Sequence, residues 1–172
     1  SMTSNLTKGH KGFRVYVVGN ENGLNKMFSQ KVGFEVVSRY QNADIIAFPG
    51  GADINPSLYG EEAIKQTSYS DFFDKRDEGI YNELRDEQLK VGICRGGQFL
   101  NVMNGGKMWQ HVTNHTETHT LVDFALTKTE FPVISTHHQM MIMGEDGELL
   151  AAAKNQGEVF CSAKYPEGIP KE

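Results

Sequence analysis

The stretch Gly92-Ile93-Cys94-Arg95-Gly96-Gly97-Gln98 predicts a sharp turn between a strand and a helix. A short, largely apolar run precedes the cysteine, and a helical pattern from Gln98 to Asn104 follows it. Small residues on both sides permit the strained, closely approached backbone that such a turn requires. The turn would hold the Cys94 sulfur at a helix N-terminus, where unpaired N–H groups favour a thiolate and can stabilise an oxyanion. These residues therefore predict a nucleophile.

Composition limits the class of protein. The 172 residues suit one domain with a sizeable core, so we expect a single domain over 1–172, with residues 1–10 a tag remnant and flexible N-terminus. A net charge of −5 argues against a nucleic-acid surface or a polybasic membrane patch. No apolar run approaches the roughly 18 residues of a membrane span. Two cysteines, Cys94 and Cys161, make no disulfide framework, which favours a reducing, cytoplasmic setting.

The first part of the chain alternates strand-like runs with helical patterns. Strands are expected at 13–18, 34–37, 43–48 and 90–93, and helices at 24–30, from Asp71 or Asp74 to Gln88, and from Cys94 to Gly105-Gly106. This alternation predicts an α/β fold with a mostly parallel sheet and helices on both faces. Later strands are expected at 121–126, 132–135 and 148–153, the last being alternatively a short helix. Ligands bind at the carboxyl ends of parallel strands, so the loops after Phe48, Ile93 and Ile134 should share that edge.

Pro49-Gly50-Gly51 ends the apolar strand 43–48 abruptly. On its own the motif is a plain turn. Beside a nucleophile, its side-chain-free backbone could offer an N–H to a developing oxyanion, and the N–H of Arg95 would be the second donor. Removing one such donor typically costs about 10²–10³ in rate.

Two groups of histidines are candidates for chemistry. The first group is Ser135-Thr136-His137-His138-Gln139. Side chains alternate in direction along a strand end, so only one of its two adjacent histidines would face a site. We favour a role of this segment in shaping a substrate pocket over acid–base chemistry. His111, His115 and His119 have a spacing that could bind a metal on a helix, but the residues between them are poor helix formers. We therefore expect no metal site and no cofactor, and keep a metal-binding protein only as a third hypothesis.

Four segments carry a resemblance to a known family. Gly92 to Val102, continuing through Gly105-Gly106 to Gln110, resembles the nucleophile region of class I glutamine amidotransferases, and most closely their gamma-glutamyl hydrolase-like branch, peptidase family C26. Phe48 to Glu61 resembles the oxyanion strand and loop of that branch. Arg76-Asp77-Glu78 resembles the start of the helix before the nucleophile strand, and Ser135 to Gln139 its histidine-pair segment.

The resemblance implies a flavodoxin-like three-layer sandwich that hydrolyses a gamma-glutamyl amide bond through a thioester on Cys94. By matching position, the amides of Gly51 and Arg95 would form the oxyanion hole. The glutamyl end would be held by Gly50, Gln98, Ser135, Thr136 and His137. The substrate would be glutamine or a gamma-glutamyl conjugate, with ammonia passed in some members to a synthetase partner. Neither nucleic acid nor membrane is expected as a partner.

One motif of the family has no match. The catalytic histidine and glutamate of the family lie in His-Pro-Glu after a late strand, and no histidine follows His138 in this sequence. Tyr165-Pro166-Glu167 supplies only Pro-Glu, after residues 161–164 that do not resemble an apolar strand end. Either the sequence stops before the motif, or the protein is a degenerate homologue that binds a glutamine-like ligand or partner without turnover. We favour the first explanation.

Overall fold

The computed structural model describes residues 12–113, 118–123, 130–134, 137–148, 151–153 and 158–170. The chain divides into two compact units, of which unit 1 comprises residues 1–52 and 70–100 and unit 2 comprises 53–69 and 101–172. Within the described ranges, helices with the length and apolarity to span a bilayer are absent. The expected single domain over 1–172 stays a prediction, and the expected tag remnant, 1–10, lies outside the described residues.

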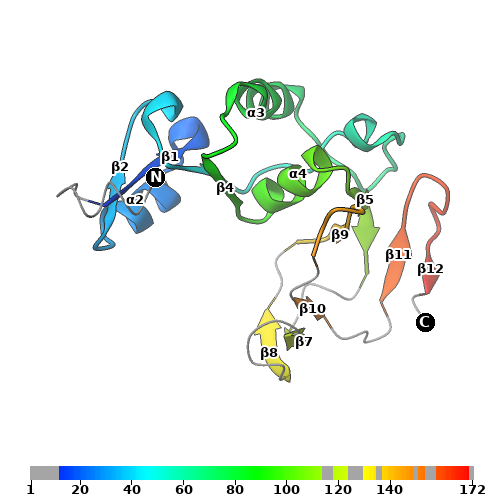
Figure 1. Ribbon diagram of the computed structural model, residues 1–172. Helices are drawn as coiled ribbons and strands as arrows, with labels where there is room; N and C mark the ends of the chain where they lie inside the picture. The colour runs from blue at the N-terminus through cyan, green and yellow to red at the C-terminus, as the bar shows by residue number, and fades with distance from the viewer. Residues whose placement is uncertain are drawn as a thin grey trace. The chain divides into compact units, whose positions relative to one another are not determined.

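Unit 1 contains a parallel sheet of four strands (Figure 1). In spatial order they are β2 (Phe34–Val36), β1 (Phe13–Val17), β3 (Ile45–Phe48) and β4 (Leu89–Gly92). All three pairings are parallel. Every residue of β3 is buried, as its uninterrupted apolar sequence requires of a central strand covered on both faces. The predicted α/β architecture with a parallel sheet is confirmed.

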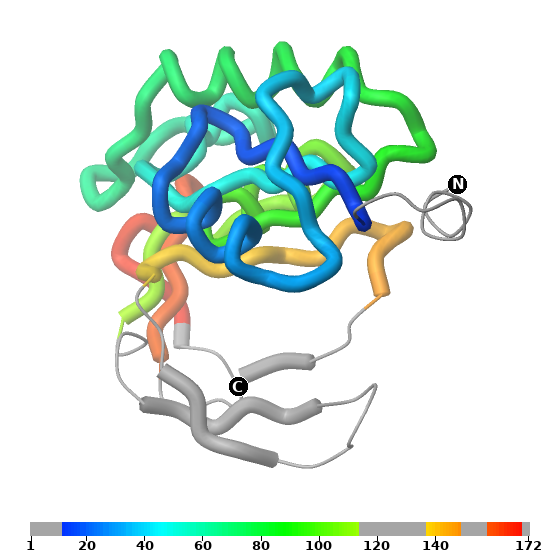
Figure 2. The backbone as a smooth tube through the Cα atoms, turned by 90° about the vertical axis from the view of Figure 1, so that its left-hand side faces the viewer, coloured from blue at the N-terminus to red at the C-terminus, as the bar shows by residue number. Residues whose placement is uncertain are grey.

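Helices follow three of these strands. They are α2 (Asn22–Ser29), α3 (Asp71–Glu83, the coil along the top of Figure 2) and α4 (Arg95–Met103), with 3-10 turns η1 (Val18–Asn20) and η2 (Tyr40–Asn42). The carboxylate of Glu21 caps α2 by accepting from the amides of Gly23 and Leu24 at 2.9 and 2.8 Å.

The prediction that α3 runs to Gln88 is wrong. The chain turns extended at Leu84. The buried Gln88 side chain instead accepts from the Arg85 amide at 2.9 Å and donates to the Ala43 carbonyl at 2.9 Å. The side-chain amide of Gln88 thus forms hydrogen bonds with main-chain groups of two loops, which a position on a helix face would not allow.

The core of unit 1 is formed by apolar side chains of the sheet and α2. Its buried members are Val15, Val17, Leu24, Ile45 and Ala47, packed against Phe13, Phe28, Phe34 and Val91. Each fully buried branched or aromatic side chain contributes about 1.5–3 kcal/mol by removal from water.

Unit 2 is built from short antiparallel pairings (Figure 1). One sheet joins β10 (Ala151–Ala153), β7 (Thr118–Asp123) and β8 (Glu130–Ile134); a second joins β12 (Ile169–Pro170), β11 (Val159–Cys161) and β6 (His111–Val112); a third pairs β5 (Lys107–Trp109) with β9 (Met140–Ile142). Unit 2 also holds the 3-10 turn η3 (Pro56–Tyr59).

Two expectations about this region are corrected. Ile134 ends a strand that pairs antiparallel with β7, so it does not end a strand of the parallel sheet. Of the two alternatives for 148–153, the strand is right, limited to Ala151–Ala153, because these residues pair with β7. The strand ending at Cys161 was not expected, since three residues are too few to show a period.

The junction of β4 and α4 is packed backbone to backbone. A Cβ added to Gly96 would lie 1.9 Å from the Phe48 carbonyl oxygen, and one added to Gly92 would lie 2.3 Å from the Gly96 carbonyl carbon. Neither contact can be relieved by a side-chain rotation, because both involve main-chain atoms. Only glycine therefore lets α4 begin this close to β3.

We expect Gly96→Ala to lower the free energy of unfolding by about 1–3 kcal/mol or more, since overpacking forces the backbone apart. The matched control is Gly79→Ala in α3, where the added Cβ meets no atom within 4 Å. That substitution should raise stability by roughly 0.5–1 kcal/mol, the ordinary gain of alanine over glycine in a helix. Urea denaturation followed by circular dichroism measures both. Equal effects of the two substitutions would contradict the close packing of Gly96 against the Phe48 carbonyl.

Candidate active site

Cys94 lies between the end of β4 and the start of α4. Its φ is 53°, in the left-handed region that non-glycine residues seldom occupy, and its side chain is exposed. The turn is fastened by the Gly96 amide, which donates to the Ile93 carbonyl at 3.0 Å, and by the Gln98 amide, which donates to the Cys94 carbonyl at 3.0 Å. Such strained residues cost about 1–3 kcal/mol and cluster at functional sites. The predicted strained turn is thus present.

The Gly50-Gly51 turn is next to Cys94. Phe48 is the register partner of Gly92, and its carbonyl accepts from the Ile93 amide at 3.0 Å, so the chain leaves β3 and β4 side by side. A Cβ on Gly50 would lie 3.6 Å from the Cys94 Cβ, and one on Gly51 would lie 3.3 Å from the Arg95 Cδ. Within the described part of the chain, neither the Gly51 amide nor the Arg95 amide donates a hydrogen bond to another residue. Gly51 and Arg95, the two residues expected to supply the oxyanion donors, therefore lie next to each other at the cysteine turn, and their role stays a prediction.

The side chain of Arg95 points into the protein, where it meets α3. Arg95 is only 3% exposed, and its Nη2 lies 2.6 Å from Asp74 Oδ1. Its Nη1 is bonded to Asp77 Oδ2, and Arg76 Nε contacts the other oxygen of Asp77 at 2.9 Å. Asp74 was expected only as a possible start of the helix, whereas it is buried and paired. The available signal was the spacing of three, which places two acids on one helix face.

Gln98 is buried in α4, one turn after Cys94. The structure thus places it near the start of α4, and its expected contact with a glutamyl group stays a prediction. Of the other expected substrate residues, Ser135 and Thr136 lie outside the described residues.

Unit 2 holds a cluster of two histidines and one carboxylate. His138 Nε2 lies 2.9 Å from both carboxylate oxygens of Asp53, and His138 Nδ1 lies 3.0 Å from His111 Nδ1. His137, the histidine expected to help hold substrate, has its Nδ1 2.7 Å from the Gln139 carbonyl oxygen. No local pattern indicates that Asp53 pairs with His138, because 85 positions separate them in the chain.

Burial lowers the pKa of the His111 imidazole from its ordinary 6.5, and the neighbouring His138 lowers it further, while Asp53 opposes both. Among the described residues there is no group of three or more His, Cys, Asp or Glu side chains that could hold a metal ion. His115 and the side chain of His119 lie outside that description.

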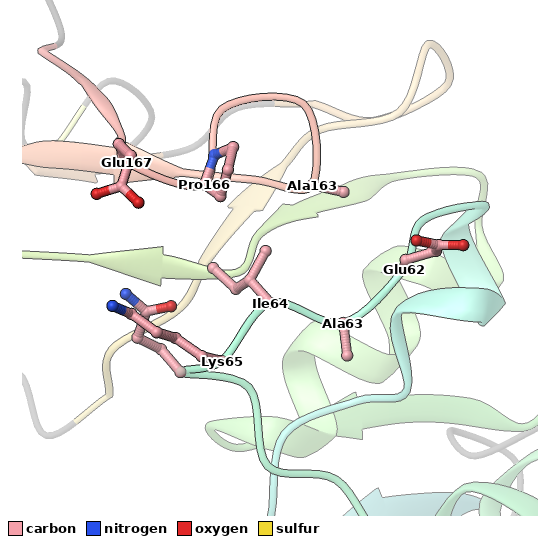
Figure 3. Close-up of a pocket in the computed structure, with 8 residues that line it drawn as sticks. Glu62, Ala63, Ile64, Lys65, Ala163, Pro166 and Glu167 are labelled. Atoms are coloured by element: carbon pink, nitrogen blue, oxygen red, sulfur yellow. The ribbon is translucent and has the colours of Figure 1, made fainter.

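Tyr165-Pro166-Glu167 follows β11 in a turn of unit 2. Pro166 and Glu167 line a pocket of about 350 Å³ together with Glu62, Ala63, Ile64, Lys65, Gln66 and Ala163 (Figure 3). Tyr165 is exposed, and its amide donates to the Ser162 carbonyl at 3.1 Å. The tyrosine therefore takes part in a surface turn.

Comparison with known proteins identifies the class of this fold as the class I glutamine amidotransferase-like superfamily. The sequence model of the peptidase C26 family matches residues 15–163, and the chain belongs to this family. The glutamine amidotransferase-like protein YvdE of Lactococcus lactis subsp. lactis is 35% identical over 155 residues, covering 72% of this chain and 66% of its own. The YvdE homologue of Lactococcus lactis subsp. cremoris is 30% identical over 119 residues, covering 57% and 63%. This chain thus spans about two thirds of the length of these curated relatives.

Solved structures confirm the flavodoxin-like fold. A GMP synthase component from Thermoplasma acidophilum superposes with a TM-score of 0.58 at 18% identity, over 91% of this chain and 81% of that one. A glutamine amido transferase from Methylobacillus flagellatus has a TM-score of 0.50 at 12% identity, over 89% and 64%. At these identities the likeness concerns the fold alone.

We expect the two cysteines to differ in reactivity. Cys94 is exposed, whereas Cys161 is buried, and burial followed by the charge of Glu167 raises the pKa of its thiol. Brief treatment of the native protein with iodoacetamide should modify Cys94 and leave Cys161 unmodified, as read by peptide mass spectrometry. After unfolding in urea both should react, which is the control. Faster modification of Cys161 in the native protein would contradict this assignment.

The lowered pKa of His111 can be measured by NMR titration of its ring protons. Half-protonation should fall below about pH 6.5, the value expected for the same residue in urea. Because the unfolded chain then binds the proton more tightly than the folded chain, this contribution to stability is complete above pH 6.5 and is lost as the pH falls. A titration midpoint at or above that of the unfolded control would contradict the effect of burial.

Proposed function

We propose that this protein is a cysteine-dependent amidohydrolase that cleaves a gamma-glutamyl amide bond. The observation that carries the proposal is the exposed Cys94 at φ 53°, with the Gly50-Gly51 turn against it. Membership of the peptidase C26 family supports the reaction class, and the expected substrate is glutamine or a gamma-glutamyl conjugate.

In the proposed reaction the Cys94 thiolate attacks the γ-carbonyl carbon, forming an S–C bond while the carbonyl oxygen becomes an oxyanion. The amides of Gly51 and Arg95 stabilise that oxyanion. As it collapses, the C–N bond breaks and the leaving nitrogen takes a proton to depart as ammonia or an amine. Water then attacks the thioester, which releases glutamate and regenerates the thiol.

The site at Cys94 supplies the nucleophile and the oxyanion donors. Protonation of the leaving nitrogen is a separate requirement, worth typically about 10²–10⁴-fold when a general acid provides it. An ester with a stable leaving anion does not need that proton. Ester and amide substrates therefore test the two parts of the reaction separately.

A second candidate is a homologue that binds or is acylated by a gamma-glutamyl compound without turning over. The observation in its favour is Tyr165-Pro166-Glu167, which has the Pro-Glu of the family's motif with a tyrosine before it. In either case we propose a cytoplasmic protein. A synthetase that receives ammonia is the proposed partner of the enzyme.

The test combines glutamine and the γ-(4-nitrophenyl) ester of L-glutamate, with Cys94→Ser as the control for spontaneous reaction. We expect wild-type protein to release 4-nitrophenolate and to form a glutamyl thioester on Cys94, which intact-protein mass spectrometry detects. The Cys94→Ser variant should do neither. Steady release of glutamate from glutamine would establish the hydrolase. One equivalent of nitrophenolate without further turnover would favour the second candidate, and identical behaviour of wild type and Cys94→Ser would refute both acylation proposals.

A further inference from the structure

The Arg95 side chain is held by two carboxylates of a single helix. Asp74 and Asp77 lie three residues apart on one face of α3, and each binds a different terminal nitrogen of the guanidinium. Asp77 is completely buried and Asp74 nearly so. Arg76 contacts Asp77 as well, so two carboxylates are matched by two guanidinium groups.

Stability alone is a poor explanation for this network. Removing charges from water is costly, and well-packed apolar side chains in place of a buried ion pair are often equally or more stabilising. The advantage of a guanidinium fork is geometric, because its donors have fixed directions and two carboxylates on a rigid helix leave it one orientation. The network therefore fixes where the Arg95 side chain lies.

Fixing that side chain also fixes two backbone groups beside the thiol. The amide of Arg95 directly follows Cys94, whose left-handed turn requires support from its surroundings. The stem of Arg95 lies against the other turn, since a Cβ on Gly51 would meet the Arg95 Cδ at 3.3 Å. One side chain thus contacts both places from which the proposed oxyanion donors come.

We infer that Asp74 and Asp77 are positioning residues, which act through the Arg95 side chain to hold the amides of Arg95 and Gly51 in the geometry that stabilises the oxyanion. This inference rests on the proposed acylation of Cys94. It assigns a task in the reaction to two carboxylates of α3 that are remote in sequence from the nucleophile and that need not touch the substrate.

The experiment compares two reactions of the same thiol. Acylation by the γ-(4-nitrophenyl) ester of L-glutamate passes through an oxyanion, whereas alkylation by iodoacetamide forms an S–C bond with loss of iodide and creates none. Both rate constants are measured for wild type, Asp74→Asn, Asp77→Asn and Arg95→Lys, after subtraction of the rate of Cys94→Ser. Asp71→Asn is the matched control, as an exposed carboxylate on the same helix.

We expect the acylation rate constant to fall about tenfold or more in the three variants of the network, while alkylation stays within about twofold of wild type. Asp71→Asn should change neither. Arg95→Lys retains the positive charge and the main-chain amide but loses the two guanidinium nitrogens that bind Asp74 and Asp77. It therefore tests the positioning role even if circular dichroism shows that Asp77→Asn does not fold.

Acylation and alkylation that fall together, or that both stay unchanged in the network variants, would overturn the positioning role while leaving the proposed function intact. If wild type and Cys94→Ser react with the ester at the same rate, the proposed acylation itself is refuted, and the positioning role with it.

Discussion

The contact of Gly96 with the carbonyl oxygen of Phe48 is the constraint on which the cysteine turn depends. Because Gly96 has no side chain, the first turn of α4 can lie directly on the end of β3. The chain between β4 and α4 then has to reverse within very few residues. Cys94 is the residue that makes this reversal, and it does so at positive φ. The strain at the cysteine is therefore a consequence of close main-chain packing by its neighbours, which holds an otherwise unfavourable conformation in place.

Packing and electrostatics have different effects at this turn. Glycine contacts determine how near α4 comes to the sheet. The ion pairs of Arg95 with Asp74 and Asp77 connect the first residue of α4 to a second helix. Burial keeps these ion pairs out of solvent screening, so their directional preference is retained at physiological salt.

Local sequence patterns predicted the features of the fold that depend on residues close together in the chain. The apolar run of β3 and the glycine-flanked Cys94 indicated a buried strand and a strained turn, and both are present. The pairing of Asp74 with Arg95 and of Asp53 with His138 could not be predicted, because it joins residues 21 and 85 positions apart and produces no periodicity. The short strands β6 and β11 of unit 2 were missed for a related reason: two or three residues form a strand only through their partners.

The chemistry near Cys94 is separable from the rest of the proposed reaction. Gly51, Cys94 and Arg95 all belong to unit 1, so the proposed nucleophile and both proposed oxyanion donors come from one compact unit. Attack on a carbonyl needs only these groups, whereas expulsion of an amine also needs a proton. A homologue could thus lose the proton donor and still form a thioester with an activated substrate. The enzyme and the alternative that does not turn over consequently share the same cysteine turn, and they differ in the later steps, which are protonation of the leaving nitrogen and hydrolysis of the thioester.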